Sequence, residues 1–180
     1  MWSTRELNGE EDSLIAPQLV SYRNNDDMTI HLIFGAWRDG NIYSFDSSTS
    51  KLSLFDKYPN NFKPKRHSIQ LYYNKTSQSY HVLSFGGWRE KSQHFYSYNI
   101  FSKKWKNLQK KINKNNNIFI YSCSKSSLCN NNNNVIITTM TGKGGDNIIY
   151  IYSLYNEKII KIITSNNISF KEVPCGFVAR

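Results

Sequence analysis

Two of the four histidines open a duplicated stretch, and imidazoles are the side chains most readily used in catalysis or metal binding. HLIFGAWRDGN at 31–41 recurs as HVLSFGGWREKS at 81–92. When the copies are aligned on their glycines, His31 falls beside Val82, and His81 falls beside Ile30. Successive strand residues face opposite sides of a sheet, so this one-residue offset puts the two histidines on opposite faces. With no HxH or HxxxH spacing and no carboxylate cluster, we expect no metal site and no duplicated catalytic histidine.

The other reactive residue types give no catalytic pattern. Cys123, Cys129 and Cys175 are odd in number and lack CxxC spacing, which argues against a zinc site or a disulfide framework. The glycine-rich GKGGD at 142–146 fails the spacing of a phosphate-binding loop, and the serine-rich stretches lack a nucleophile elbow. We therefore expect a protein that is not an enzyme and holds no cofactor.

The duplicated Trp-Arg pairs, Trp37–Arg38 and Trp88–Arg89, point instead to binding, because Trp and Arg are enriched at recognition surfaces. The chain carries a net charge of +10, unevenly spread. Residues 57–125 hold fourteen Lys/Arg against one Asp/Glu, whereas residues 1–56 hold four against nine. A basic middle segment favours an acidic or phosphate-bearing partner, although a solvated Lys- and Asn-rich surface gives the same composition.

The elements that position these residues are short strands. β-branched and aromatic runs alternate with Gly, Asn, Asp, Ser or Pro, and none persists at helical spacing for ten residues. The pattern predicts an all-β protein with these strands: 15–22, 29–34, 42–46, 51–55, 68–74, 80–85, 95–99, 104–108, 118–123, 135–140, 148–153, 158–164 and 168–173.

A repeat of 53–54 residues organises the strands. IYSFDSSTSKL at 42–52 aligns with FYSYNIFSKKW at 95–105 and with IYIYSLYNEKI at 149–159. Two aromatics two residues apart, followed by a large apolar residue, mark a strand, a turn and the next strand. A period near 50 with four strands per unit is typical of a β-propeller blade.

On these residues the chain resembles the kelch-repeat family. SFGG at 84–87, Tyr96, Trp105 and KPKRHS at 63–68 match its glycine pair, aromatic, tryptophan and turn, whereas the first and third copies depart from the pattern. The resemblance implies one kelch-like domain over 1–180. Its blades fall at about 14–56, 67–108 and 118–164, and 165–180 begin a further blade. We assign the glycine pairs and the repeated aromatics to architecture.

The resemblance also implies a binding mouth, formed by inter-blade loops and by the loops after the glycine pairs. Antiparallel topology puts these two kinds of loop on one rim of the blades. The expected rim also includes Tyr58, Phe62 and Lys111. We expect the partner-binding residues to be Trp37, Arg38, Trp88, Arg89, Lys63, Lys65 and Arg66.

These features predict a non-enzymatic, kelch-type interaction module whose basic face binds an acidic segment of another protein. One alternative is nucleic-acid binding through the basic aromatic rim, with salt-sensitive affinity. Another is a remnant of a copper-radical-oxidase-like propeller, although its Tyr/His copper cluster does not map onto this sequence. Since three blades leave apolar faces open, we also expect a partial gene product or self-association. The N-terminus has no apolar signal core and no apolar run reaches membrane-spanning length, so we expect a cytoplasmic protein without a membrane partner.

Overall fold

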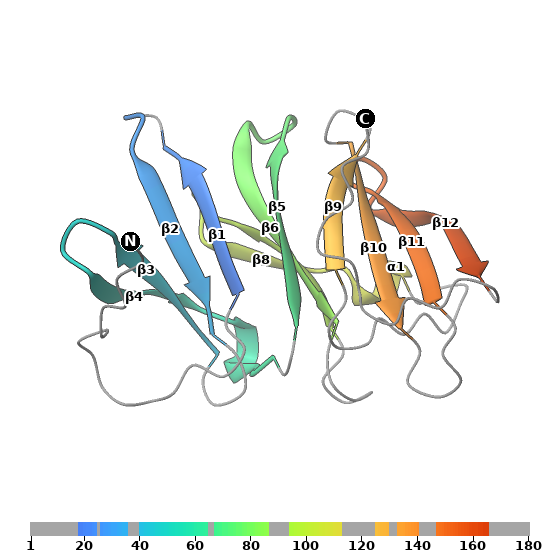
Figure 1. The fold of residues 1–180 in the computed structure, drawn as a ribbon, viewed down its shortest axis with the longest axis horizontal. Coiled ribbons are helices and arrows are strands. Elements are labelled where there is room, and N and C mark those ends of the chain that lie inside the picture. Colours follow the sequence, from blue (N-terminus) through green and yellow to red (C-terminus); the bar gives the residue numbers. More distant parts are fainter. Residues whose placement is uncertain are drawn as a thin grey trace, which may run out of the picture. The chain divides into compact units, whose positions relative to one another are not determined.

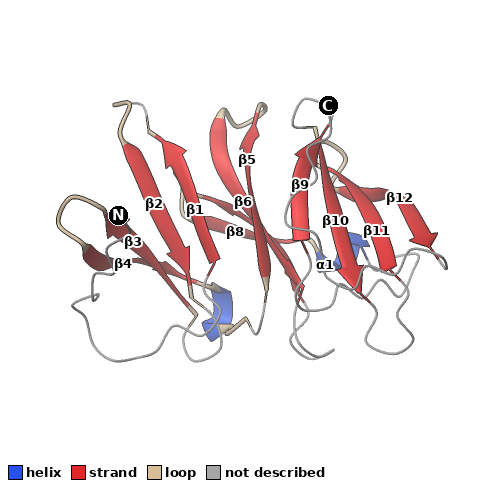
Figure 2. Cartoon of the chain, in the orientation of Figure 1, coloured by secondary structure: helices blue, strands red, loops and turns tan. Residues whose placement is uncertain are grey.

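The computed structural model describes residues 18–24, 26–35, 40–64, 67–86, 94–112, 125–129, 133–140 and 147–165. These residues form three four-stranded antiparallel sheets, each made of consecutive strands (Figures 1 and 2). The predicted all-β fold class is confirmed, and the three sheets fit the blades of a partial β-propeller. The chain divides into two compact units, Met1–Pro64 and Lys65–Arg180.

The first unit contains one sheet. Its strands are β1 (Gln18–Arg23), β2 (Thr29–Phe34), β3 (Asn41–Asp46) and β4 (Lys51–Lys57), and a 3-10 turn, η1 (Pro59–Asn61), follows them. Its buried apolar side chains are Val20, Leu32, Phe34, Ile42 and Tyr58.

The second unit contains the other two sheets. The second sheet consists of β5 (Ser68–Asn74), β6 (Ser79–Gly86), β7 (His94–Asn99) and β8 (Lys104–Asn107), followed by the short helix α1 (Gln109–Ile112). The third sheet consists of β9 (Lys125–Cys129), β10 (Asn134–Met140), β11 (Asn147–Ser153) and β12 (Lys158–Ser165). The first strands of the two sheets, β5 and β9, lie side by side (Figure 1).

A shared core joins these two sheets. Leu83, Phe85 and Phe95 of the second sheet belong to one buried cluster with Val135, Ile137, Tyr150 and Tyr152 of the third. The rings of Phe95 and Tyr152 meet across it with centroids 4.9 Å apart. The repeated aromatics Tyr150 and Tyr152 therefore pack between sheets, as predicted. Burial of these side chains is the main stabilising term of the second unit.

Five described turns between strands share a side-chain-to-backbone hydrogen bond. A short polar residue at the end of the preceding strand accepts a hydrogen bond from a backbone N–H within the turn, as in Asx- and ST-turns. The accepting residues are Asn24, Asp46, Asn74, Asn99 and Ser153. The four-residue turns after Asp46, Asn74, Asn99 and Ser153 each end on a residue with positive φ: Ser50, Gln78, Lys103 and Glu157.

The structure also tests the predicted strand bounds and glycines. Two predicted strands, 118–123 and 168–173, lie outside the described residues, as does the predicted further blade from residue 166 onward. The sequence missed β9, whose residues KSSLC are largely polar. Gly86 has a φ of 91°, a backbone conformation that supports its architectural assignment.

In the part of the chain that the structure describes, no helix is long and apolar enough to cross a membrane.

Candidate functional site

Most of the predicted rim lies outside the described residues. Trp37, Arg38, Trp88, Arg89, Lys65 and Arg66 all fall there, whereas Lys63 is described and exposed. One rim aromatic was wrongly assigned: Tyr58 is only 3 % exposed and packs edge-on against Phe34, with ring centroids 6.2 Å apart. Its ring covers Phe34, so Tyr58 belongs to the core of the first unit.

The histidine offset predicted from the sequence is supported by strand pairing. His31 lies opposite Phe45, whereas the residue opposite Tyr98, the repeat equivalent of Phe45, is Val82. His31 Nδ1 lies 2.7 Å from Ser21 Oγ, and His81 belongs to a different set of contacts described below. The two histidines are therefore not equivalent positions.

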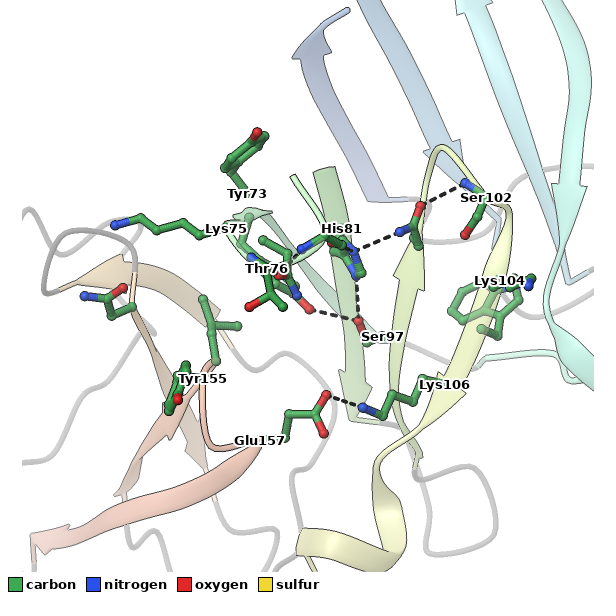
Figure 3. Close-up of a pocket in the computed structure, with 17 residues that line it drawn as sticks. Tyr73, Lys75, Thr76, His81, Ser97, Ser102, Lys104, Lys106, Tyr155 and Glu157 are labelled. Atoms are coloured by element: carbon green, nitrogen blue, oxygen red, sulfur yellow. Dashed lines mark hydrogen bonds and ion pairs between the residues drawn. The ribbon is translucent and has the colours of Figure 1, made fainter. Parts of the chain in front are cut away.

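The second unit contains a polar pocket of about 640 Å³. It lies where the β5–β6, β7–β8 and β11–β12 turns meet, between the second and third sheets (Figure 3). Most of its lining comes from the second sheet: Tyr72, Tyr73, Asn74, Lys75, Thr76, Ser77, His81, Ser97, Asn99, Ser102, Lys104, Trp105 and Lys106. The third sheet adds Asn133, Leu154, Tyr155 and Glu157.

Strand register explains why these polar groups gather. Tyr72 pairs with His81, His81 with Asn99, and Asn99 with Lys104, so one row crosses all four strands of the second sheet on the same face. That face is the one whose other half carries Leu83, Phe85 and Phe95 in the shared core. The same sheet face is thus apolar at one end and polar at the hairpin-turn end.

Hydrogen bonds fix the state of His81. Asn99 Oδ1 accepts from the backbone N–H of Ser102 at 2.9 Å, which leaves its Nδ2 to donate to His81 Nε2 at 3.0 Å. His81 Nε2 is therefore the unprotonated nitrogen, and Nδ1 carries the hydrogen toward Ser97 Oγ at 3.3 Å. Ser97 Oγ in turn lies 2.9 Å from the hydroxyl of the buried Tyr72.

The environment keeps His81 neutral. Burial lowers its pKa, the Lys106 ammonium lowers it further, and the Glu157 carboxylate opposes both. Because both ring nitrogens already have partners, protonation would place an N–H against the Asn99 amide. His81 is thus a neutral imidazole whose orientation is fixed by Asn99 and Ser97.

Glu157 is the only carboxylate in the described lining. Its Oε1 accepts from Lys106 Nζ at 2.5 Å, and its Oε2 accepts from Lys111 Nζ. Figure 3 shows Lys106 and Glu157 pointing toward one another from β8 and the β11–β12 turn. Burial raises the pKa of Glu157, but the two lysines outweigh it and hold that pKa below its usual value. Lys111, expected on the rim, is instead engaged in this contact.

Behind the pocket lies a second phenol. The Tyr152 hydroxyl is buried and has no hydrogen-bond partner among the described residues. Its pKa is raised, chiefly by burial and then by Tyr72 and Glu157, so it stays a neutral hydroxyl at physiological pH. The Tyr152 phenol and the His81 imidazole beside the pocket are thus both neutral at physiological pH.

The charged side chains of the pocket lining are mostly cationic. Within the described residues, Lys75 and Lys104 form no ion pair, and Lys106 uses one of its three donors on Glu157. Trp105 also lines the pocket, but its indole stacks on Tyr98, with centroids 4.5 Å apart, on the face of β8 opposite to Lys104 and Lys106. The arrangement suits an acceptor-rich, negatively charged group. Among described residues, no three His, Cys, Asp or Glu side chains are grouped to hold a metal.

Sequence reasoning missed this pocket, because its residues are separated in the chain and only strand pairing brings them together. The one usable signal was that His81, Ser97 and Asn99 are polar, although they fall in strands that the repeat predicts.

No protein-family model matches the chain, and no curated protein is significantly similar to it in sequence.

Proposed function

We propose that the chain is a non-enzymatic interaction module of kelch-like propeller type that binds an acidic segment of another protein. The second and third four-stranded sheets share one core, which makes a scaffold suited to recognition at low ordering cost. The expected location is the cytoplasm.

The observation that carries this proposal is the excess of positive charge in and around the second sheet. Residues 57–125 hold fourteen basic residues and one acidic residue. Lys75, Lys103, Lys104 and Lys106 are exposed around the turns of this sheet. Opposite charge on a partner speeds association and selects against neutral or basic competitors.

The test is fluorescence anisotropy of the full chain with a labelled peptide of four Glu-Ser repeats. A peptide of four Gln-Ser repeats is the matched control, since only the charge differs. We expect saturable binding of the acidic peptide that weakens with added salt, and none of the neutral peptide. Equal binding of both peptides, or binding of neither, contradicts the proposal.

A labelled single-stranded RNA in the same assay separates the nucleic-acid alternative. Stacking and counterion release predict an affinity that falls steeply with salt. RNA binding much tighter than peptide binding would indicate that the chain is a nucleic-acid-binding protein.

A further inference from the structure

We propose that the pocket between the second and third sheets, at the end where their hairpin turns meet, is the site that binds the acidic segment. The inference rests on the proposed function, but it places the contact with the acidic segment in the pocket instead of on the predicted rim. The β5–β6 and β7–β8 turns lie at the opposite end of the second sheet from the loop that follows Gly86. The proposed site is therefore not the rim that the repeat pattern predicts.

Polar residues occupy part of a sheet face that otherwise packs against the third sheet. Phe85 and Phe95 bury that face against the third sheet, yet Ser97, Asn99 and His81 continue it in a polar hydrogen-bonded row. Further apolar residues there would extend the shared core and stabilise the unit. A polar stretch on a core face is typical of a functional site, where stability gives way to binding.

The lysines of the pocket remain available to a ligand. The row from Tyr72 to Asn99 satisfies itself internally through the contacts at 2.9–3.3 Å described above. The ammonium groups of Lys75 and Lys104 lie outside that row, and they can only donate. With three lysines and one glutamate, the described lining has a net charge of +2. A carboxylate-bearing ligand fits both the sign and the hydrogen-bonding character.

The spacing of two pocket lysines matches that of side chains along an extended peptide. Lys104 and Lys106 are two residues apart on β8, so both side chains leave the same face about 7 Å apart. An extended peptide repeats its side chains at that same interval. The site therefore fits an extended Asp/Glu-x-Asp/Glu segment, with one carboxylate toward each lysine. A volume of about 640 Å³ accommodates a few residues of such a segment.

The experiment uses the full chain and the labelled Glu-Ser peptide. Lys104→Glu should weaken binding by about tenfold or more, because it reverses a charge in the pocket. The matched control is Lys161→Glu, which makes the same charge change at an exposed position of β12. We expect that control to change the affinity by less than about twofold, since screening weakens distant charges. Lys104→Gln serves as a milder variant if the reversal disturbs folding.

A second readout localises the ligand. His81 lines the pocket, so peptide binding should shift its ring resonances and leave those of His94, at the opposite end of the second sheet, unchanged. A peptide with the same composition but four contiguous glutamates should bind more weakly, because it places neighbouring carboxylates on opposite sides of the extended chain.

The outcomes distinguish the two proposals. If Lys104→Glu and Lys161→Glu weaken binding equally while a variant with Arg38, Arg66 and Arg89 changed to Glu abolishes it, the pocket is overturned and the interaction module stands. If the wild-type chain binds no acidic peptide, both fail. Free glutarate that displaces the peptide at equal concentration contradicts the peptide assignment and indicates a small dicarboxylate site.

Discussion

His67 is a buried imidazole at the start of the second unit. It is 3 % exposed, and its ring centroid lies 6.0 Å from that of His94. Burial, with a smaller contribution from the His94 charge, lowers the pKa of His67 to about 3. In the unfolded chain the same imidazole titrates near its ordinary value of 6.5. Folding thus selects the neutral form of this side chain.

This shift predicts a loss of stability in mild acid. Between pH 6.5 and pH 3 the unfolded state binds a proton at His67 that the folded state does not, so the free energy of unfolding decreases as the pH falls. The slope from this one group reaches about 1.4 kcal/mol per pH unit. Urea unfolding of the wild-type chain and of His67→Gln at pH 7, 6 and 5 measures it, and the variant should show the shallower dependence. His67 ring resonances that titrate between pH 7 and 5 would contradict the assignment.

Gly40 is a second residue with a specific structural reason. The chain after β4 folds back over it, and the Tyr58 N–H donates to the Gly40 carbonyl oxygen at 2.7 Å. A Cβ at position 40 would collide with the backbone carbonyl oxygen of Phe62. The contact is with backbone, so a side-chain rotation cannot relieve it.

We therefore expect Gly40→Ala to destabilise the first unit by about 1–3 kcal/mol, the usual cost of overpacking. Thermal unfolding followed by circular dichroism gives the change. Lys51→Ala, at an exposed position of β4 in the same unit, is the control and should change stability by less than about 0.5 kcal/mol. A Gly40→Ala variant as stable as this control would mean that the chain after β4 does not lie over Gly40.

Most strands could be predicted from the alternation of β-branched and aromatic residues and from the turn residues that end them. Strands such as 29–34 and 68–74 were found with their observed bounds because β-branched and aromatic residues fill them and polar turns end them. β9 was missed because KSSLC has neither alternation nor aromatic content. The pocket could not be predicted, because Tyr72 and Lys104 are 32 residues apart and become neighbours only through three successive strand registers.

Glu157 connects two elements of different sheets and sits inside the proposed site. It lies in the β11–β12 turn and accepts hydrogen bonds from Lys106 on β8 and Lys111 on α1. Its carboxylate is therefore bound to Lys106, one of the two lysines that we propose bind the acidic ligand. Glu157 and a carboxylate of the ligand would compete for the Lys106 ammonium group.

The variant Glu157→Gln should separate these two effects. It raises the net charge of the described lining from +2 to +3, so the affinity for the Glu-Ser peptide should increase several-fold. It also removes two partly exposed ion pairs, which lowers stability by at most about 1 kcal/mol. Anisotropy and thermal unfolding measure the two changes on one protein. Weaker peptide binding together with lower stability would mean that Glu157 orders the site rather than competes for it.

At the scale of the whole molecule, the third sheet presents an apolar edge. Ile160, Ile162 and Ile163 of the edge strand β12 are 47 %, 41 % and 37 % exposed. An edge strand also presents backbone N–H and C=O groups that can pair with another chain. Adjacent exposed isoleucines on such a strand favour association with a further sheet, in line with the expectation that open blade faces are covered by self-association.

We therefore expect the chain to self-associate, with a mass in solution above its monomer mass of 21.0 kDa. Size-exclusion chromatography with light scattering measures this mass. Changing Ile160 and Ile162 to Lys should shift the chain toward monomer, because two charges then interrupt the apolar edge. Phe101→Ser is the matched control, since Phe101 is an exposed apolar residue in the β7–β8 turn, away from that edge, and its loss should leave the mass unchanged. A wild-type chain that runs as a monodisperse monomer of 21.0 kDa and unfolds cooperatively would defeat the proposal, because the apolar edge would then need no partner.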